Sequence, residues 1–297
     1  MISTMQDNFI KYHTCTIHPV LNQYVKHLWC MEAEPNDGDY FIFRTYATLY
    51  PTLFFTKQGY LEPIGKKVNG NLLLVGQSNK WHRYRVNKDF SVLGITFYPY
   101  TIPLFFGIQA DAITNQNLDS NELNQHELLI EFCQKVVDGN FDPDTLNKLL
   151  QECATKAVIH DEKILSLISS IASGQSDTRN VSGDQIFMSQ RNFERKFKYY
   201  SGFRPKSFVN LVRLINSFRA ISFDQKKLSD TTFEQDYFDQ SHFSNEFKKH
   251  TGFQPKVFTK GIRAESEIWK NFVDFFQFLS ICPPVLCKDK INHLYDK

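Results

Sequence analysis

The feature that most constrains the fold is an internal repeat in the C-terminal half of the chain. Residues 188–208 and 238–258 align at an offset of 50 without a gap. Over the twenty positions that begin at Ser189 and Asp239, nine residues are identical, where chance would give about one. The chain must therefore build the same small motif twice.

Each copy has the pattern of a short, well-delimited helix. Ser189 and Asp239 are good N-cap residues, and each follows an apolar residue spaced to pack on the helix. Gly202 and Gly252 are placed as left-handed C-caps, with a proline three residues later. The repeat predicts helices over about 190–200 and 240–250, with a buried stripe made of Phe193, Phe197, Tyr200, Phe243 and Phe247.

The opposite face of each predicted helix is polar. In the first copy it carries Gln190, Arg191, Glu194, Arg195 and Lys198, and in the second Gln240, Ser241, Ser244, Asn245 and Lys248. Arginine forks and side-chain amides can pair with base edges in a major groove, while lysines suit phosphates. A solvated helix face would explain one such stripe, but two matched stripes favour a nucleic-acid surface.

The distribution of charge supports that interpretation. The chain of 297 residues carries a net charge of only +2. Residues 1–175 contain 14 basic and 18 acidic side chains, residues 176–260 contain 15 and 9, and residues 261–297 contain 5 and 5. The segment with the repeat therefore holds all the excess positive charge, as expected of a DNA-binding domain.

The segment of about 80 residues from Asn180 to Phe258 resembles the double helix-turn-helix DNA-binding domain of AraC-family transcriptional regulators. The resemblance is clearest in Asp239-Gln240-Ser241-His242-Phe243-Ser244, Phe247-Lys248-Lys249 and Thr251-Gly252-Phe253-Gln254-Pro255. It implies two subdomains joined by a long helix over about 206–222. It also implies two recognition helices that enter successive major grooves about 34 Å apart.

The resemblance assigns roles to individual positions. It implies base reading by Arg191, Glu194 and Arg195 in the first helix, and by Gln240, Ser241, Ser244 and Asn245 in the second. Gln190 shares the polar face, and Lys198, Lys248 and Lys249 are expected at phosphates. His242 lies at the edge of the face, where a DNA contact and a structural role both remain open.

Several positions depart from the family pattern. The first helix of each motif has Gly183 or Thr232 where a small alanine is usual, and Asp236 replaces the turn glycine of the second motif. Arg204 and Gln254 replace the serine that usually precedes each proline. These changes affect the stability of the first helices more than the recognition surface.

The N-terminal half has a different pattern. Short apolar runs separated by Gly, Asn, Asp and Pro predict strands from Tyr24 to Phe97, and three- and four-residue spacing then predicts helices up to Ala172. The expected fold class is α+β: a β-rich, sandwich-like or barrel-like sensor or dimerisation domain (1–175), an all-α double helix-turn-helix domain (176–260) and a helical extension (261–297).

Parts of the N-terminal half also resemble a sensor-like domain found in one subgroup of these regulators. The matching stretches are Val75-Gly76-Gln77, Gly94-Ile95-Thr96-Phe97-Tyr98-Pro99 and Phe105-Phe106-Gly107-Ile108. The resemblance implies a β-rich domain and a small-molecule effector that the sequence does not identify. A homodimer is left open. Trp81, His82, Tyr84 and Arg85 either line a ligand pocket or simply alternate along a strand.

Other chemistry finds no support in the sequence. The nine histidines form no metal-ligand spacing, and neither a phosphate loop nor a nucleophile elbow occurs, so we expect no enzyme, cofactor or metal. No secretory signal precedes Phe9, which predicts a cytoplasmic protein with six free thiols. The uncharged run Phe90–Ala110 contains two prolines, so we expect no membrane span there.

The tail beyond the repeat is longer than DNA binding requires. An apolar stripe at helical spacing predicts a helix that packs on the chain's own domains or on a partner; its residues are Trp269, Phe272, Val273, Phe276 and Leu279. The sequence as a whole predicts a bacterial-type transcriptional regulator that binds double-stranded DNA sequence-specifically and responds to an effector. The alternative is a helical protein-interaction module that has lost DNA binding.

Overall fold

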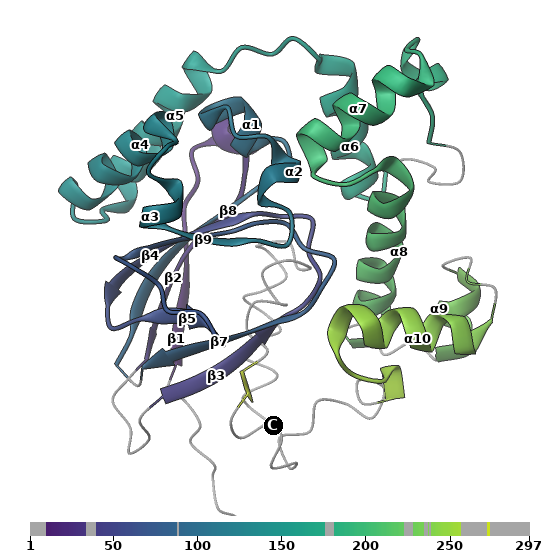
Figure 1. Cartoon of the computed structure of the whole chain (residues 1–297), viewed down its shortest axis with the longest axis horizontal. Coiled ribbons are helices and arrows are strands. Elements are labelled where there is room, and N and C mark those ends of the chain that lie inside the picture. The colour runs from purple at the N-terminus through teal and green to yellow at the C-terminus, as the bar shows by residue number, and fades with distance from the viewer. Residues whose placement is uncertain are drawn as a thin grey trace, which may run out of the picture.

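The computed structural model describes residues 10–33, 40–87, 89–175, 181–222, 228–234, 237, 239–256 and 272–273. A strand-rich N-terminal part is followed by helices, which confirms the α+β fold class (Figure 1). The strands form two sheets. The larger has the order β1 (Ile10–Cys15), β2 (Val25–Ala33), β8 (Ser91–Phe97), β4 (Thr52–Gln58), β6 (Leu72–Val75) and β9 (Asn117–Asp119), and the smaller has the order β10 (Phe272–Val273), β3 (Tyr40–Thr45), β7 (His82–Asn87) and β5 (Leu61–Pro63).

Large apolar side chains fill the space between the two sheets. Trp29 and Phe54 come from the larger sheet and meet edge to face, with ring centroids 5.6 Å apart. Tyr84 and Val86 come from β7 of the smaller sheet and belong to the same buried cluster. Because these side chains occupy the interior, the sandwich has a solid core there.

Helices cover the outer face of the larger sheet. These helices are α1 (Thr101–Phe106), α2 (Ala110–Ile113), α3 (Ser120–Leu123), α4 (Glu127–Asp138) and α5 (Pro143–Lys156), and a 3-10 turn, η1 (Pro19–Leu21), packs on α5. The uncharged run Phe90–Ala110, where the sequence predicts no membrane span, forms β8 and α1 with a turn between them. Phe106 of α1 packs on Phe97 of β8 and on Phe132 of α4, which ties the helices to the sheet.

The described part of the repeat region contains six helical segments. They are α6 (Glu162–Ala172), the 3-10 turn η2 (Gly183–Ile186), α7 (Gln190–Ser201), α8 (Pro205–Ser222), α9 (Leu228–Glu234) and α10 (Gln240–Thr251). Both predicted recognition helices and the long connecting helix are confirmed. Helix α6 packs on α7 and α8, although it precedes the segment assigned to DNA binding from the sequence.

The extension after the repeat corrects one prediction. Phe272–Val273 forms the short strand β10, which pairs in parallel with Ile42 and Phe43 of β3, so these two residues are not helical. The edge of β3 offers unpaired backbone groups that a passing segment can satisfy, and this competes with helical periodicity. Trp269, Phe276, Leu279 and the cysteines Cys282 and Cys287 lie outside the described residues.

Candidate nucleic-acid interface

Helices α7 and α10 are built alike, as the repeat predicts. In each, two buried phenylalanines one turn apart meet with ring centroids 5.5 Å apart: Phe193 with Phe197, and Phe243 with Phe247. Both helices end at a glycine in the left-handed region. The starts differ, because the Asp239 side chain accepts a 2.7 Å bond from the His242 amide, whereas Ser189 makes no side-chain capping bond. Both residues occupy the N-cap position, as predicted, but only Asp239 makes the side-chain capping bond.

Helix α8 connects the two copies and sets their separation. It has 18 residues and is therefore about 27 Å long at 1.5 Å per residue. Helix α7 lies at one end of α8 and α10 at the other, and both turn their C-terminal ends toward the β-rich domain (Figure 1). Their N-terminal ends, where recognition helices make most base contacts, consequently face away from it.

The polar face of α7 is exposed, but its side chains already bond to one another. Gln190, Arg191, Glu194, Arg195 and Lys198 are all exposed. The Gln190 amide donates to Glu194 at 2.8 Å and accepts from the Gly183 backbone at 3.2 Å, and Arg195 donates to Asn192 at 2.9 Å. Glu194 and Arg195, which the sequence predicts to read bases, are therefore held in defined positions by these bonds.

The polar face of α10 has fewer internal bonds. Gln240, Ser241, His242, Asn245, Lys248 and Lys249 are exposed, and Ser244 is partly exposed. Lys249 pairs with Glu246 at 3.1 Å, whereas Lys248 makes no ion pair with any residue that the structure describes. The His242 ring packs edge to face on Tyr237 at 5.7 Å, so a structural contact exists beside its exposed edge.

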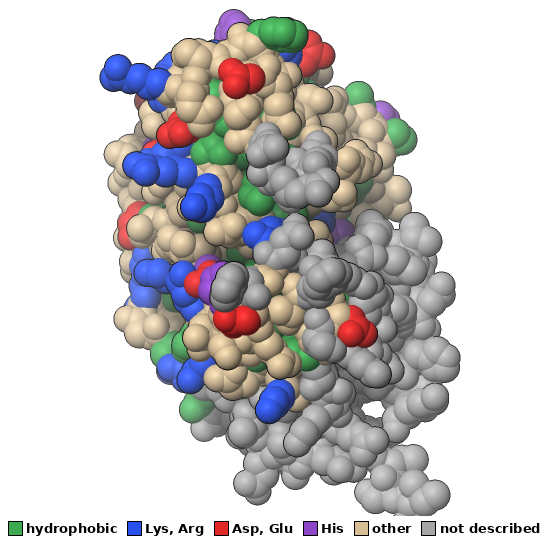
Figure 2. Space-filling view, turned by 90° about the vertical axis from the view of Figure 1, so that its right-hand side faces the viewer, with side chains coloured by type: hydrophobic (Ala, Val, Ile, Leu, Met, Phe, Trp, Pro, Cys, Tyr) green, Lys and Arg blue, Asp and Glu red, His purple; other side chains and the backbone are tan. Residues whose placement is uncertain are grey.

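The side of the molecule toward which the repeat faces carries clustered basic groups. Figure 2 views the right-hand side of Figure 1 and shows Lys and Arg side chains gathered down its left part, with Asp and Glu scattered among them. Exposed cations of this kind attract a polyanion and release its counterions on contact. Because acidic side chains lie among the basic ones, a polyanion must match the positions of the charges as well as their excess.

The C-terminal end of α7 is fastened to the β-rich domain. Lys198 forms a 2.8 Å ion pair with Asp111 of α2, and the Thr114 hydroxyl donates to the Gly202 carbonyl at 3.0 Å. A Cβ atom at Gly202 would lie 1.9 Å from the Gln77 side-chain nitrogen, so only glycine fits this joint. Lys198, predicted at a phosphate, is thus engaged within the protein.

The C-terminal end of α10 is fastened at the matching place. The Ala47 amide donates to the His250 carbonyl at 3.2 Å, and the buried His250 ring bonds through Nδ1 to the Asn79 carbonyl. Its Nε2 lies 3.2 Å from a Glu246 carboxylate oxygen. Both ring nitrogens therefore face oxygen atoms of other residues.

Sequence reasoning missed this joint between the domains. Its residues come from Ala47, from the loop 77–79, and from α2 with the turn that follows it (110–115), none of which the sequence marks as a contact site. One signal was present: the repeat places Tyr200 and His250 at equivalent positions, and both are too polar for a simple buried stripe. Tyr200 donates to Asp161 at 3.0 Å, and burial together with this carboxylate raises the pKa of its hydroxyl.

The first helix of the first motif is only the 3-10 turn η2. A Cβ atom at Gly183 would lie 2.3 Å from the Met188 carbonyl oxygen, so η2 packs more closely on the start of α7 than alanine would allow. In the second motif, Thr232 is buried in α9 and its hydroxyl bonds to the Leu228 carbonyl at 2.7 Å. Asp236 and Phe238 lie outside the described residues.

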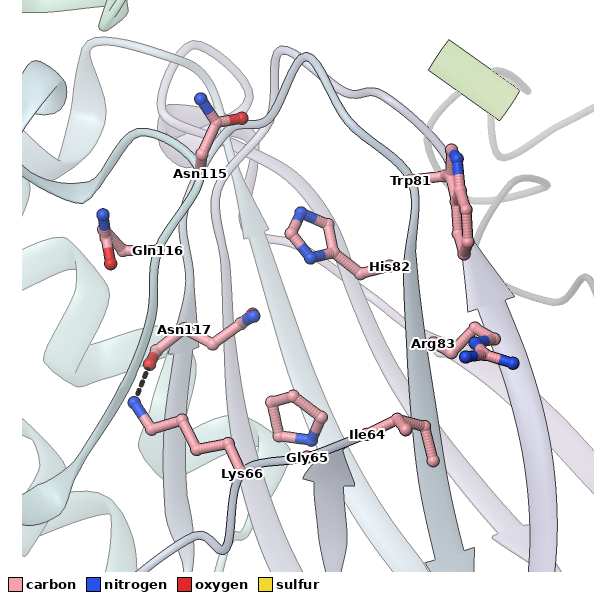
Figure 3. Close-up of a pocket in the computed structure, with 10 residues that line it drawn as sticks. Ile64, Gly65, Lys66, Trp81, His82, Arg83, Asn115, Gln116 and Asn117 are labelled. Carbon is pink, nitrogen blue, oxygen red and sulfur yellow. Dashed lines mark hydrogen bonds between the residues drawn. The ribbon is translucent and has the colours of Figure 1, made fainter. Parts of the chain in front are cut away.

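A cavity of about 410 Å³ opens beside the joint (Figure 3). Trp81 and His82 are among its lining residues, as the ligand-pocket interpretation predicts, whereas Tyr84 is buried and bonds to Asn117 at 2.7 Å and Arg85 pairs with Glu62. The ligand-pocket interpretation therefore stays a prediction for Trp81 and His82, and alternation along β7 accounts for Tyr84 and Arg85. The lining contains no carboxylate; it consists of Pro63, Ile64, Gly65, Lys66, Trp81, His82, Arg83, Asn115, Gln116 and Asn117.

Few other sites occur in the part of the chain that the structure describes. No cluster of three or more His, Cys, Asp or Glu side chains there could hold a metal ion. No described helix is both long enough and apolar enough to cross a membrane. Cys15, Cys30, Cys133 and Cys153 are free thiols, although strand pairing brings the sulfurs of Cys15 and Cys30 to 3.9 Å.

Comparison with known proteins gives two family matches. A helix-turn-helix domain model matches residues 183–261, and a domain of unknown function, DUF6597, matches residues 13–119. No curated protein sequence matches significantly. Among solved structures, ToxT from Vibrio cholerae O395 is 14% identical with a TM-score of 0.40, covering 85% of this chain and 97% of ToxT.

Two further solved structures are similar at the same low level. ToxT from Vibrio cholerae strain SCE256 with bound unsaturated fatty acid is 14% identical, with a TM-score of 0.38 over 76% of this chain and 96% of that one. The AraC-like transcriptional activator CuxR is 13% identical, with a TM-score of 0.23 over 71% and 88%.

The duplicated helices, their exposed polar faces and the family match together define a DNA-binding transcriptional regulator of the helix-turn-helix class. The helix-turn-helix match over residues 183–261 agrees with the resemblance seen in the sequence.

Proposed function

We propose that this regulator recognises a specific duplex sequence with α7 and α10 and that a small molecule bound by the β-rich domain modulates this binding. The observation that supports sequence-specific binding is the pair of matched helices at the two ends of α8. Both expose a polar face at the end that points away from the β-rich domain. A nonspecific binder would need only the cations.

Each helix contributes differently to recognition in this proposal. Arg191 and Arg195 are suited to guanine edges, and Glu194 to the amino group of cytosine. In α10, the base-reading side chains are Gln240, Ser241, Ser244 and Asn245, and His242 contributes at the edge. Lys248 contacts a phosphate directly, while Lys249, Gln190 and Lys198 must first exchange the partners that they have within the protein.

The cavity beside the joint is the proposed effector site. The larger volume between the sheets is occupied by Trp29, Phe54 and neighbouring side chains, so it leaves no room for a ligand. At about 410 Å³ the cavity suits a small molecule, and the absence of a lining carboxylate favours a polar ligand rich in acceptor oxygens.

The same loops that border the cavity also hold the helices. The Asn115 side chain accepts bonds from the Ser78 hydroxyl at 2.8 Å and from the Asn79 amide at 3.0 Å. The Asn79 carbonyl in turn bonds to His250, and Thr114, next to Asn115, bonds to Gly202. A ligand that moves Asn115 would therefore act on both recognition helices.

Three further features belong to the proposal. The DNA-binding unit begins at α6, since that helix packs on α7 and α8 and not only on the N-terminal helices. The regulator acts in the cytoplasm. A homodimer would bind two sites at once, which would raise the affinity for paired operators.

Selection of bound duplexes from a random library tests the central claim. The full chain should enrich one asymmetric motif, with affinity that falls as salt rises. The alternative function, a helical protein-interaction module, enriches no motif above the starting pool. Once a motif is known, acceptor-rich metabolites can be screened for an effect on affinity, with a variant that fills the cavity, Asn117→Trp, as the control.

A further inference from the structure

Phe187 is an aromatic side chain that the fold leaves in solvent. It lies between η2 and α7 and is 91% exposed, more than any other large apolar side chain in the described part of the chain. Its neighbours Ile186 and Met188 both pack against the main core. Of these three residues, Phe187 is therefore the one whose side chain does not pack against the core.

The backbone at Phe187 is strained in order to hold this position. Its φ is 58° and ψ 45°, the left-handed conformation that side chains with a Cβ rarely adopt. The turn is also rigid: the Phe187 amide donates to Asp184 at 3.2 Å and the Met188 amide to Gly183 at 2.9 Å. Phe187 is the C-cap of η2, so the turn into α7 fixes this conformation, and the side chain that it carries is exposed.

The second copy of the repeat provides a contrast. Tyr237 precedes the N-cap of α10 by two residues, as Phe187 precedes the N-cap of α7. The Tyr237 ring packs on Phe243 at 4.9 Å, and the Arg213 guanidinium lies 5.0 Å above it. An aromatic side chain at this position can thus pack against its own domain, as Tyr237 does, whereas Phe187 stays exposed.

The surroundings of Phe187 favour DNA as its partner. It precedes Gln190 and Arg191 of the polar face by three and four residues, so it continues the proposed reading surface of α7. The Lys163 ammonium lies 5.2 Å above the ring and brings a positive charge to the same edge. A duplex offers apolar groups beside its phosphates, namely thymine methyl groups and the carbons of deoxyribose.

We propose that Phe187 packs against an apolar group of the duplex at the flank of the α7 half-site, and that it contributes to affinity there as a rigid anchor. The proposal rests on the proposed DNA-binding function and adds a contact from outside both recognition helices. Because the backbone of the turn is hydrogen-bonded before binding, little backbone freedom is lost when the ring docks.

The test uses the full chain and a duplex selected from a random library. Phe187→Ala and Phe187→Gly are compared with Leu128→Ala, which removes an exposed leucine from α4. We expect both Phe187 variants to bind the duplex roughly tenfold more weakly, as for loss of a stacked aromatic contact. Leu128→Ala should bind like the wild type.

Thermal unfolding of the same variants separates a lost contact from a damaged fold. Glycine adopts the left-handed conformation without strain, so Phe187→Gly should unfold at a temperature no lower than the wild type while it binds DNA more weakly. Unchanged DNA affinity in Phe187→Gly would overturn the proposal and would point to a protein partner for this ring. A variant that loses both stability and affinity would also contradict it.

Substitution of deoxyuridine for thymine at each flanking position distinguishes the two apolar groups. If one substitution weakens wild-type binding and has no effect on Phe187→Ala, the ring contacts that thymine methyl group. If none does, and the Phe187 variants still bind weakly, it contacts deoxyribose. If the wild type selects no motif at all, the proposed function itself has failed, which is a different outcome from normal binding by Phe187→Gly.

Discussion

The two copies of the repeat have the same skeleton but differ in how they are connected to the rest of the protein. The copy around α7 is held by side chains: Lys198 pairs with Asp111, and Thr114 bonds to Gly202. The copy around α10 is held mostly through backbone groups of Ala47 and Asn79 that bond to His250. Duplication has preserved the helix, while each copy has acquired its own attachment.

The polar faces of the copies differ in the same way. The first is charged, and its members are already bonded to one another or to the β-rich domain. The second is largely uncharged, and Lys248 has no ion-pair partner among the described residues. In the proposed complex the first copy therefore exchanges several internal bonds for DNA contacts, whereas on the second the pair to exchange is Lys249–Glu246. Differences between matched positions of the repeat can test this.

The largest effect is expected at the joint of the first copy. Gly202→Ala forces a Cβ atom onto Gln77 and Thr114 and adds left-handed strain, so we expect the free energy of unfolding to fall by about 2 to 3 kcal/mol. Gly107→Ala is the control, because its φ is also positive but nothing lies within 4 Å. It should cost about 1 kcal/mol in the same urea titration. Equal losses would show that the joint tolerates a side chain.

The next effect concerns base reading. Arg195→Ala should weaken binding to the selected duplex by roughly 1 to 3 kcal/mol and relax the preference at one base position. Asn245→Ala tests the equivalent position of the second copy and should relax a different base. The exposed Lys148 of α5 serves as the control, and Lys148→Ala should change neither quantity. A loss that is equal on every sequence would limit Arg195 to backbone contacts.

A smaller effect separates the two lysines at equivalent positions. Lys248→Ala should lower the slope of log affinity against log salt by about 1, the value for one phosphate contact. Lys198→Ala should lower it less, because Asp111 already pairs with that ammonium. Asp111→Asn should then steepen the slope by freeing Lys198. Identical slopes for both lysine variants would mean that the ion pair opens at no cost when DNA binds.

The smallest effect is the pH dependence of stability at position 246. Burial alone would raise the pKa of the Glu246 carboxyl, but hydrogen bonds from Lys249 and His250 outweigh it and hold the pKa below its usual range. A lowered pKa stabilises the fold above the unfolded-state value near 4.3, and this contribution is lost as pH falls below it.

Between about pH 5 and pH 3, the free energy of unfolding should therefore fall less in Glu246→Gln than in the wild type. The difference should be below about 1 kcal/mol, because solvent screens the partly exposed Glu246–Lys249 pair. Urea titrations at several pH values measure it. The first copy has Lys196 at the equivalent position, paired with Asp161 instead, and Lys196→Gln should leave the contribution of Glu246 intact. If Glu246→Gln leaves the acid limb unchanged, the bonds to Lys249 and His250 do not bias its ionisation.

The sequence predicted the elements whose causes are local. Helix limits at Gly202 and Gly252, the stripe of phenylalanines and the strands up to Phe97 follow from periodicity and backbone preference, which act over a few residues. The polar faces of α7 and α10 could be identified because the repeat showed the same face twice. These predictions required no knowledge of which parts of the chain meet.

The features that the sequence did not predict depend on contacts between distant segments. The bond from Asn79 to His250 spans 171 residues and uses a backbone carbonyl, which leaves no mark on residue type. The strand at Phe272–Val273 is decided by the open edge of β3, and the reduction of the first helix to η2 by the approach of Gly183 to Met188. In each case tertiary contact outweighed local preference.

The use of backbone groups at the α10 joint has a consequence for how this protein can diverge. Almost any residue supplies a backbone amide and a backbone carbonyl. Ala47 and Asn79 can therefore be replaced during evolution without loss of the joint that these groups form with His250. The side chains of the β-rich half can thus change while α10 keeps the same attachment to it.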